Sequence, residues 1–260
     1  MRLVCVGDCG IDRYVELGVE RPGGITFNVA ANATRSFPAG TDITIITAVG
    51  DDAEADVVAR AIARVDPDAF VTRFAGRTPV QYIAIEPSGE KRFIRYEPGV
   101  LTELRIGTRE REIIAGSDLL VTTVFAQVEA LFDSVMSVSS AGLRAVDFTD
   151  LADVDDGLGL VSRYVDRFDI AFFGLRADQT QLIDALEQIA VSRGRLFVVT
   201  LGPDGSLAIG GPTRIATRAV AIDRIVDTTG AGDSFAAGFL SEYCATRNVQ
   251  RSLERGAAQA

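Results

Sequence analysis

The chain has 260 residues, of which 47% are hydrophobic, and its formal net charge at pH 7 is −10. This length and composition indicate a folded domain with a sizeable core rather than a disordered chain, and the negative charge argues against nucleic acid or anionic membrane as the main partner. Because the sequence has no histidine, Ser-His-Asp triads, Cys-His dyads and zinc sites with histidine ligands are excluded.

Three cysteines, Cys5, Cys9 and Cys244, form no CxxC pair. A small odd number of cysteines is typical of free thiols in a reducing compartment, so we expect a cytoplasmic protein. We see no signal peptide after Met1 and no apolar run of the length that a transmembrane helix needs.

The first predicted element is a buried parallel strand over the apolar run Leu3–Gly7, which Asp8 and Asp12 follow. Aspartate is common in turns, and this is one interpretation of both residues. The other is contact with a ligand, because open α/β sheets bind ligands beyond the carboxyl ends of their strands.

A glycine pair comes next, after a segment at 13–19 that predicts a strand leaving the main sheet. Gly23 and Gly24 precede Asn28 and a helix of small residues over Val29–Arg35. Paired glycines let the backbone approach a ligand closely, and Asn28 can both donate and accept hydrogen bonds at the start of the helix. A glycine loop with an asparagine near a helix cap explains the same pattern without a ligand.

The middle of the sequence interrupts an alternation of strands and helices. Ile43–Val49 predicts a strand and Ala53–Val65 a helix, but three strand-like segments then follow without a helix, at 71–74, 80–86 and 91–96. Pro87–Glu90 predicts the hairpin turn between the last two. These strands therefore indicate a separate small β unit.

From Thr102 onward, strands and helices alternate again, which predicts a parallel sheet with right-handed crossovers. The expected strands are Leu119–Val124, Arg144–Asp150, Ile170–Phe173 and Leu196–Leu201, and the expected helices include Val128–Ser139 and Asp178–Ser192.

The stretch Asp227–Phe235 follows the apolar-rich segment Ala219–Val226, which we expect to end in a strand, and precedes a buried helix. Small residues at 230–232 let successive backbone N–H groups point at one spot, and the free N–H groups and dipole of the helix add to a site for phosphate. Asp233 would repel an anion there unless it takes the proton from an attacking hydroxyl. An ordinary helix start with an aspartate near its cap is the alternative.

The whole string DTTGAGDSFAAGF resembles the second signature of the ribokinase/PfkB family of carbohydrate kinases, and GG-x3-N with its small-residue helix resembles the first. TAVGDD and VVTLGPDGS also resemble family strings. The resemblance implies one ribokinase-like α/β domain over residues 1–260, with three layers, a mainly parallel central sheet and a small β-strand lid formed by about 13–20 and 71–97.

The resemblance also implies roles for individual residues. Asp233 would be the catalytic base, and the backbone of Gly230, Ala231 and Gly232 would form the anion hole. The acceptor would be held by Asp12, Gly23, Gly24 and Asn28, with Gln81 and Arg92 as candidate contacts from a lid that excludes water. ATP would be the donor, together with Mg²⁺, and the nucleotide would lie along Thr200, Gly202, Gly205 and Thr228. An ordinary hairpin turn at 202–205 is the alternative for that loop.

The chain departs from the family after the strand at 170–173. Many members have an N-x-x-E sequence there that helps to place magnesium and phosphate, and Gly174–Asp178 has neither residue at the expected spacing. We assign no metal ligand, although Asp147 or Asp178 could help. At the start of a helix, Asp233 should have a low pKa.

The expected partners are ATP and a small-molecule sugar or sugar–amine conjugate. GDCGIDRY, VGDD and AVDFTD are similar to strings of the bacterial members that phosphorylate fructoselysine, and acidic residues would suit an acceptor with amines. Fructokinase, ribokinase and nucleoside kinase specificities remain open, as does a non-catalytic sugar or nucleotide sensor, which the missing N-x-x-E favours and the intact Asp233 opposes. Exposed lid edges can pair between copies, so a homodimer is an open alternative to a monomer.

Overall fold

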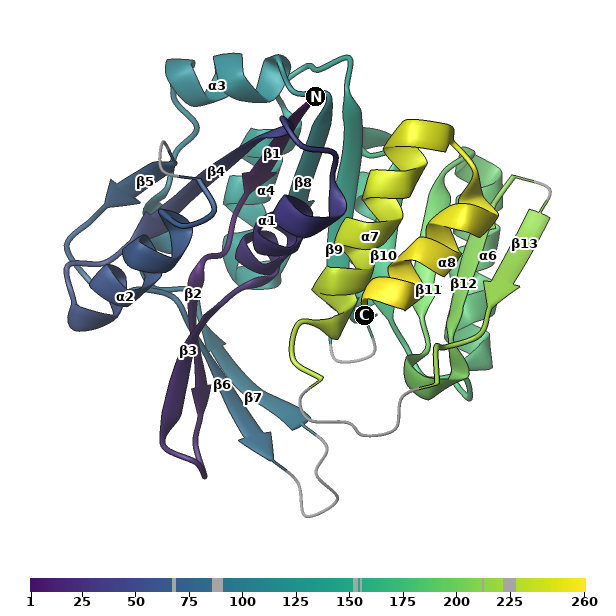
Figure 1. Cartoon of the computed structure of the whole chain (residues 1–260), viewed down its shortest axis with the longest axis horizontal. Coiled ribbons are helices and arrows are strands. Elements are labelled where there is room, and N and C mark those ends of the chain that lie inside the picture. Colours follow the sequence, from purple (N-terminus) through teal and green to yellow (C-terminus); the bar gives the residue numbers. More distant parts are fainter. Residues whose placement is uncertain (67–68, 86–90, 152–153, 155, 212, 222–227) are drawn as a thin grey trace.

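The fold consists of two β-sheets and the helices that cover the larger one (Figure 1). The structure is a computed structural model that describes residues 1–66, 69–85, 91–151, 154, 156–211, 213–221 and 228–260. The larger sheet has the strand order β13-β12-β11-β10-β9-β8-β1-β4-β5, and the smaller has the order β3-β2-β6-β7. The expected strand at the end of 219–226 falls mostly outside the described residues.

Seven neighbouring strands of the large sheet are parallel, as the alternation of strands and helices predicts. They are β1 (Arg2–Val6), β4 (Asp42–Val49), β5 (Phe70–Arg73), β8 (Leu119–Thr123), β9 (Leu143–Asp150), β10 (Ile170–Gly174) and β11 (Leu196–Thr200). β12 (Ser206–Gly210) and β13 (Thr213–Thr217) extend one edge in antiparallel pairing.

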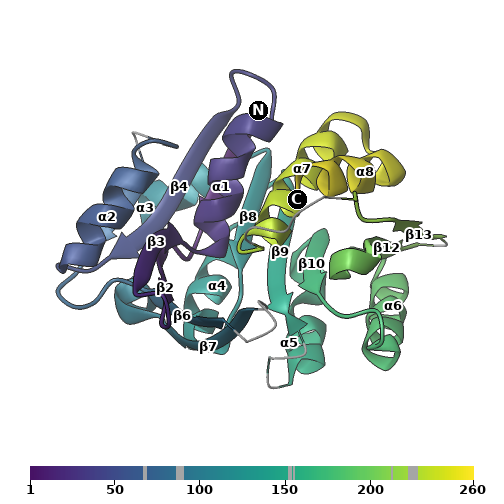
Figure 2. The same cartoon turned by 60° about the horizontal axis from the view of Figure 1, so that its bottom comes forward.

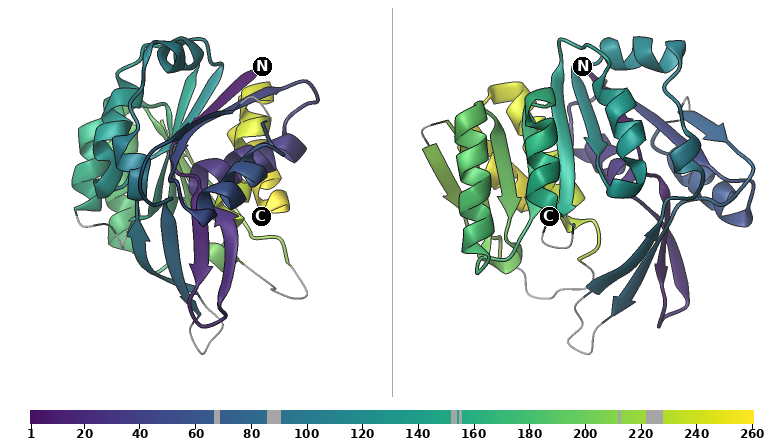
Figure 3. Two further views of the ribbon diagram at one scale, coloured as in Figure 1. Left: turned by 90° about the vertical axis from the view of Figure 1, so that its left-hand side faces the viewer. Right: turned by 180° about the vertical axis from the view of Figure 1, so that it is seen from behind.

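Helices cover both faces of this sheet, so the predicted three-layer α/β architecture is confirmed (Figures 1 and 3). One face carries α1 (Ile25–Ser36), α2 (Ala53–Ile62), α7 (Ala231–Thr246) and α8 (Val249–Gln259). The core of the other includes residues of α3 (Thr108–Ala115), α4 (Glu129–Met136), α5 (Gly157–Tyr164) and α6 (Thr180–Arg193). Short 3-10 turns lie at Gly99–Glu103, Ala126–Val128, Val165–Arg167 and Gly202–Asp204. Within the described ranges, no helix is long and apolar enough to cross a membrane.

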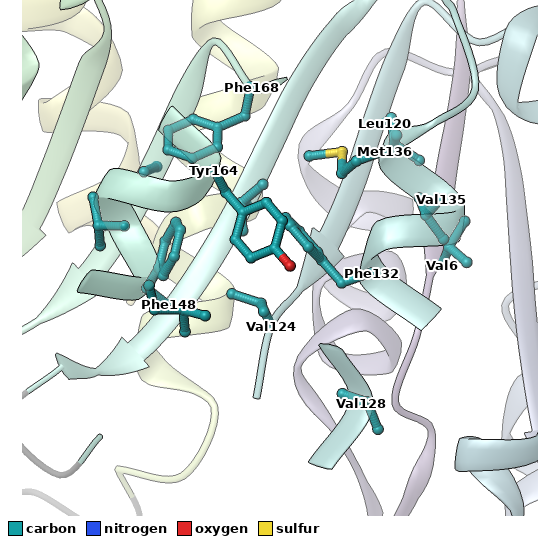
Figure 4. Packing of buried hydrophobic residues seen from close by; sticks show 14 of the residues in the cluster. Val6, Leu120, Val124, Val128, Phe132, Val135, Met136, Phe148, Tyr164 and Phe168 are labelled. Carbon is teal, nitrogen blue, oxygen red and sulfur yellow. The ribbon is translucent and has the colours of Figure 1, made fainter. Parts of the chain in front are cut away.

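Aromatic side chains fill the core under α4, α5 and α6 (Figure 4). The ring of Phe132 meets that of Tyr164 edge to face, with centroids 4.7 Å apart, and Phe148 stacks on Phe173 at 5.2 Å. Each such pair stabilises the fold by about 0.5–1.5 kcal/mol beyond the contribution from burying its surface area. The Tyr164 hydroxyl donates to Glu129 at 2.7 Å, so its polar end is not left without a partner.

The four-stranded sheet projects beyond the carboxyl end of β1, and Figure 2 shows it from that end. Its strands are β2 (Gly10–Tyr14), β3 (Val19–Gly23), β6 (Val80–Ile85) and β7 (Lys91–Glu97). The expectation that the strand at 71–74 belongs to this small unit is wrong, because β5 pairs with β4 in the large sheet. The predicted turn at 87–90 lies outside the described residues.

The chain passes between the two sheets four times. These passages join β1 to β2, β3 to α1, β5 to β6, and β7 to the turn at Gly99–Glu103. Each passage contains a glycine with positive φ, a conformation that residues with a Cβ rarely adopt. The four are Gly7 (φ 146°), Gly24 (φ 106°), Gly76 (φ 135°) and Gly99 (φ 49°).

Candidate active site

A cavity of about 720 Å³ lies where the four-stranded sheet, α1 and the start of α7 meet. Its lining brings together predicted site residues that are far apart in the sequence: Asp12, Gly24, Asn28, Gln81, Arg92, Gly230 and Asp233. The volume falls within the range of about 300–1,000 Å³ that is usual for small-molecule sites.

Asp233 lies in the first turn of α7 and is only 9% exposed. Its Oδ2 accepts a hydrogen bond from Nδ2 of Asn28 at 2.8 Å. Asn28 is in the first turn of α1, so two helix starts hold the two side chains together. This bond fixes one carboxylate oxygen of Asp233 at the wall of the cavity.

The backbone before Asp233 makes the sharp turn that the glycines predict. Gly230 precedes α7 with φ 74°, its carbonyl accepts from the Ser234 N–H at 2.8 Å, and the Ala231 N–H bonds to the Thr228 carbonyl at 3.2 Å. A Cβ built on Gly232 would have no atom within 4 Å, so no packing contact requires glycine there. Open space beside the backbone at a helix N-terminus is suited to an anion.

Asp8 holds the start of α1. Its carboxylate accepts from the backbone N–H groups of Ile25 at 2.8 Å and Thr26 at 3.1 Å, so an aspartate 17 residues earlier replaces a local helix cap. Gly24 is necessary here because a Cβ on it would lie 2.5 Å from the Asp8 carbonyl oxygen. The sequence offered a turn or a ligand contact for Asp8, and this capping role could not be read from local spacing.

Gly23 has a different reason to be glycine. It pairs with Gly10 across β2 and β3, and a Cβ on Gly23 would lie 2.3 Å from the carboxyl carbon of Asp12. The absent side chain therefore leaves room for Asp12, which is buried at 7% exposure. The glycine pair was expected to let a ligand approach, which stays a prediction. In the structure its missing side chains leave room for Asp8 and Asp12, and Gly24 also lines the cavity.

Burial and neighbouring carboxylates raise the pKa of Asp233 well above its usual value. Burial is the largest cause, followed by the negative charge of Asp147, and the hydrogen bond from Asn28 opposes both. Asp8 and Asp12 raise it further. The expectation of a low pKa is therefore wrong, because desolvation and like charges outweigh the helix dipole.

Two neighbours of Asp233 have raised pKa values themselves. Burial, together with the charges of Asp8 and Asp150, raises the pKa of Asp147 to about 7, although the Thr149 N–H bonds to its carboxylate at 2.7 Å. Burial raises the pKa of Asp8 to about 6 against its hydrogen bonds from Thr26 and Ile25. Asp8, Asp12 and Asp233 are buried, and the half-buried Asp147 lies close enough to raise the pKa of Asp233.

The four-stranded sheet contributes a row of polar side chains to the cavity. Asp12 of β2 pairs with Gln81 of β6, and Gln81 pairs with Tyr96 of β7, so the three occupy one row across the sheet. Gln81 is held by bonds from its amide to the carbonyls of Tyr82 at 3.0 Å and Arg95 at 3.1 Å. Arg92 also lines the cavity and is exposed.

The residues predicted to contact the nucleotide do not line this cavity. Thr200 ends β11 and donates to the Phe173 carbonyl at 3.3 Å, and Gly202 and Gly205 follow it with φ 57° and 98°. The hairpin turn that was the alternative for this loop is present, since these glycines lie between antiparallel β11 and β12, and the nucleotide contact stays a prediction. Thr228 is exposed just before the start of α7.

No described group of three or more acidic or thiol side chains is arranged to hold a metal ion. Neither Asp147 nor Asp178 lines the cavity, and the surface residue Asp178 pairs with Arg176 at 3.2 Å. The side chains near Asp233 therefore do not by themselves form a closed metal site.

Solved structures with this arrangement of sheets and helices define the class of fold. The chain resembles the adenosine kinase from Sinorhizobium meliloti with a TM-score of 0.80 and 20% identity, over 99% of this chain and 91% of that one. It resembles the Arabidopsis thaliana ribokinase complexed with ribose and ATP with a TM-score of 0.77 and 18% identity, over 99% and 90%. The fold is therefore ribokinase-like.

Sequence comparisons then give the family. Residues 167–260 match the model of the pfkB family carbohydrate kinases. A fructosamine kinase of Bacillus subtilis (strain 168) is 28% identical over 267 residues, covering 100% of this chain and 89% of the relative. The fructoselysine 6-kinase of Escherichia coli (strain K12) is 28% identical over 257 residues, covering 98% and 94%. Residues 167–260 thus match a pfkB family carbohydrate kinase domain, and over nearly its whole length the chain is similar to sugar kinases.

Proposed function

We propose that this kinase transfers the γ-phosphoryl group of ATP to a primary hydroxyl of a sugar or sugar derivative, with Asp233 as the catalytic base. The observation that carries the proposal is the position of Asp233. It lies at the amino end of α7, is bonded to Asn28, and faces a cavity lined from both sheets. This arrangement supports proton removal beside a site for phosphate.

The acceptor is held by Asp12, Gln81 and Asn28, which place its hydroxyl next to Asp233. Asp233 takes the hydroxyl proton as the new oxygen–phosphorus bond forms and the bond to the ADP oxygen breaks. Its raised pKa makes the deprotonated carboxylate a stronger base than an exposed aspartate. The N–H groups at 230–232 and the dipole of α7 stabilise the negative charge of the transferred group.

The nucleotide side of the site is formed by Thr200, Gly202, Gly205 and Thr228 in this proposal. Mg²⁺ would supply neutralisation of the negative charge on the phosphate oxygens. Because the described side chains form no ready cluster for a metal, we infer that the ion is held chiefly by phosphate oxygens and water. We infer that the enzyme works in the cytoplasm, where its co-substrate ATP and its cofactor Mg²⁺ are supplied.

Fructoselysine, converted to fructoselysine 6-phosphate, is the acceptor that we propose first. Two relatives that match nearly the whole chain are named for fructosamine and fructoselysine. Aspartates 8, 12, 150 and 233 line the cavity, which suits an acceptor that carries amines. Phe93 and Ile94 line it too and are 51% and 46% exposed, so they offer an apolar surface to an alkyl chain.

The test is Mg²⁺-dependent ADP release with fructoselysine, fructose, ribose and adenosine as separate acceptors. We expect turnover with fructoselysine at the highest kcat/KM. Turnover with only one of the others would keep the kinase and replace the acceptor. If no acceptor supports turnover while ATP and sugar still bind, the sensor function replaces the kinase. The same samples, run by sedimentation at several concentrations, distinguish a homodimer from a monomer.

A further inference from the structure

We propose that Tyr14 is a positioning residue for phosphoryl transfer, because its hydroxyl ties the four-stranded sheet to the loop that precedes α7. The hydroxyl lies 2.6 Å from Oγ1 of Thr229, a residue 215 positions later in the chain. The inference rests on the proposed function. It adds a side chain of the four-stranded sheet, which carries proposed acceptor contacts, and this side chain acts on the loop at 228–230 beside the proposed phosphate site.

The Tyr14 side of this contact is rigid. Tyr14 is the last residue of β2, and because strand residues alternate in direction it shares a face with Asp12. It is 4% exposed, and the guanidinium of Arg21 lies over its ring at 5.7 Å from the centroid. The next backbone N–H, that of Val15, bonds to the Ile83 carbonyl at 3.0 Å. The hydroxyl is thus presented from a packed ring on a paired strand.

Thr229 belongs to the loop before α7, whose backbone conformation must be fixed by contacts with its surroundings. Thr229 lies between Thr228, whose carbonyl accepts from Ala231, and Gly230, whose φ is 74°. Glycine allows many backbone conformations, so the loop's shape depends on anchors such as this hydroxyl pair. Thr229 and Gly230 both line the cavity that contains Asp233.

The hydroxyl contact therefore joins the acceptor side of the site to the phosphoryl side. Asp12, two residues before Tyr14, belongs to the acceptor side, and Gly230, directly after Thr229, belongs to the phosphoryl side. A displacement of about 1 Å between reacting groups can cost about 100-fold in rate. Loss of the hydroxyl pair should therefore lower kcat more than it raises KM, because binding surfaces remain while their alignment relaxes.

A double-mutant cycle tests this with Tyr14→Phe, Thr229→Val and the double variant. We expect kcat to fall about tenfold in each single variant and no further in the double variant, because either change breaks the same bond. Thr229→Ser keeps the hydroxyl and should restore most of kcat. Tyr243→Phe, which removes a hydroxyl from α7 away from the loop, is the matched control and should leave kcat unchanged.

Additive losses in the double variant, or an unchanged kcat in Tyr14→Phe, would overturn the inference while the wild-type turnover still supports the kinase. If the wild-type enzyme shows no sugar-dependent turnover, the proposed function fails first. The cycle is then read from amide hydrogen exchange in the loop at 228–231, where faster exchange in each single variant and no further rise in the double variant support the link, and additive or absent changes refute it. Thermal unfolding of every variant confirms that the fold is intact.

Discussion

Nδ2 of Asn28 and Oδ2 of Asp233 lie 2.8 Å apart, although 205 residues separate them in the chain. The bond joins the first turns of α1 and α7, which pack side by side on one face of the large sheet (Figure 1). The two family signatures of the sequence therefore meet at one pair of atoms. Burial disfavours the ionised form of Asp233, whereas the hydrogen bond from Asn28 favours it. Asp233 therefore has a raised pKa but can still ionise.

Asp233→Asn should abolish most of the activity. The amide keeps the size of the side chain but cannot accept the hydroxyl proton, so we expect kcat to fall about 10²–10⁴-fold, the usual range for general base catalysis. Acceptor and nucleotide affinities, measured by calorimetry, should change much less. A variant with more than about half of the wild-type kcat would rule out Asp233 as the base.

Gly232→Ala separates chemistry from folding. A Cβ at Gly232 meets no atom within 4 Å, and alanine is a better helix former than glycine, so the melting temperature should stay the same or rise slightly. The methyl group would occupy the space beside the phosphate loop, so we expect a large fall in kcat/KM. Full activity in this variant would show that no phosphoryl group approaches the backbone here.

Gly24→Ala is the contrasting change. It places a Cβ at φ 106° and 2.5 Å from the Asp8 carbonyl oxygen, so the backbone around Asp8 and the start of α1 must shift. We expect a loss of stability of about 1–3 kcal/mol, read from denaturant unfolding. A wild-type unfolding midpoint in Gly24→Ala would contradict the proposed packing of Asp8 against this glycine.

The pH dependence of kcat/KM should reflect the raised pKa of Asp233. Activity needs the deprotonated carboxylate, so it should rise with pH through a pKa well above the usual value for aspartate. Among the neighbouring charges, that of Asp147 raises the pKa of Asp233 most. Asp147→Asn removes this charge, so Asp233 should ionise more easily and the acidic limb of the activity profile should move to lower pH. Asp133→Asn, which changes a surface carboxylate paired with Arg167, is the control and should not move it.

The free energy of unfolding should also depend on buried carboxylates, but it should fall as pH rises, whereas activity should rise. The pKa values of Asp8 and Asp147 rise in the folded state to about 6 and about 7, above the unfolded value of about 3.9. The folded state therefore binds more protons, and the free energy of unfolding should fall as pH rises through this window. Asp147→Asn should raise the melting temperature at about pH 8 by roughly 2–4 °C, as about 1 kcal/mol does in a chain of this size.

Melting curves at about pH 5 and about pH 8 check this, because the gain from Asp147→Asn should be smaller at the lower pH and should vanish only below the unfolded pKa of about 3.9. Asp133→Asn again serves as the control. An equal effect at both pH values would mean that the substitution acts through packing and not through the charge of Asp147.

Most of the large sheet could be predicted from the sequence because its strands are apolar runs that alternate with amphipathic helices. β12 and β13 were not predicted, and β5 was assigned to the wrong sheet. The segment at 71–74 is strand-like in composition, and nothing local indicates whether it pairs with β4 or with β6. Pairing is decided by contacts distant in sequence, and here Thr47 and Ala48 of β4 meet Val71 and Thr72.

The site was predictable where a residue works through its own local backbone, as at Gly230 and Asp233. It was not predictable where the effect depends on distant neighbours. Asp147 is more than 80 residues from Asp233, and its influence on the pKa of Asp233 appears only when β9 and α7 come together. Capping of α1 by Asp8 is hidden in the same way, because the intervening chain forms a complete hairpin of β2 and β3.

The four positive-φ glycines mark every connection between the two sheets. In two of them the missing side chain also leaves room for a backbone carbonyl, because a Cβ would lie 2.5 Å from the Asp8 oxygen at Gly24 and 2.1 Å from the Arg77 oxygen at Gly99. A side chain at either point would push the connection away from the backbone that it packs against. The tip of the β2–β3 hairpin is different, since Val15 and Leu17 are exposed there. Substitutions at the tip should therefore be tolerated better than substitutions in the connections that join the four-stranded sheet to the rest of the molecule.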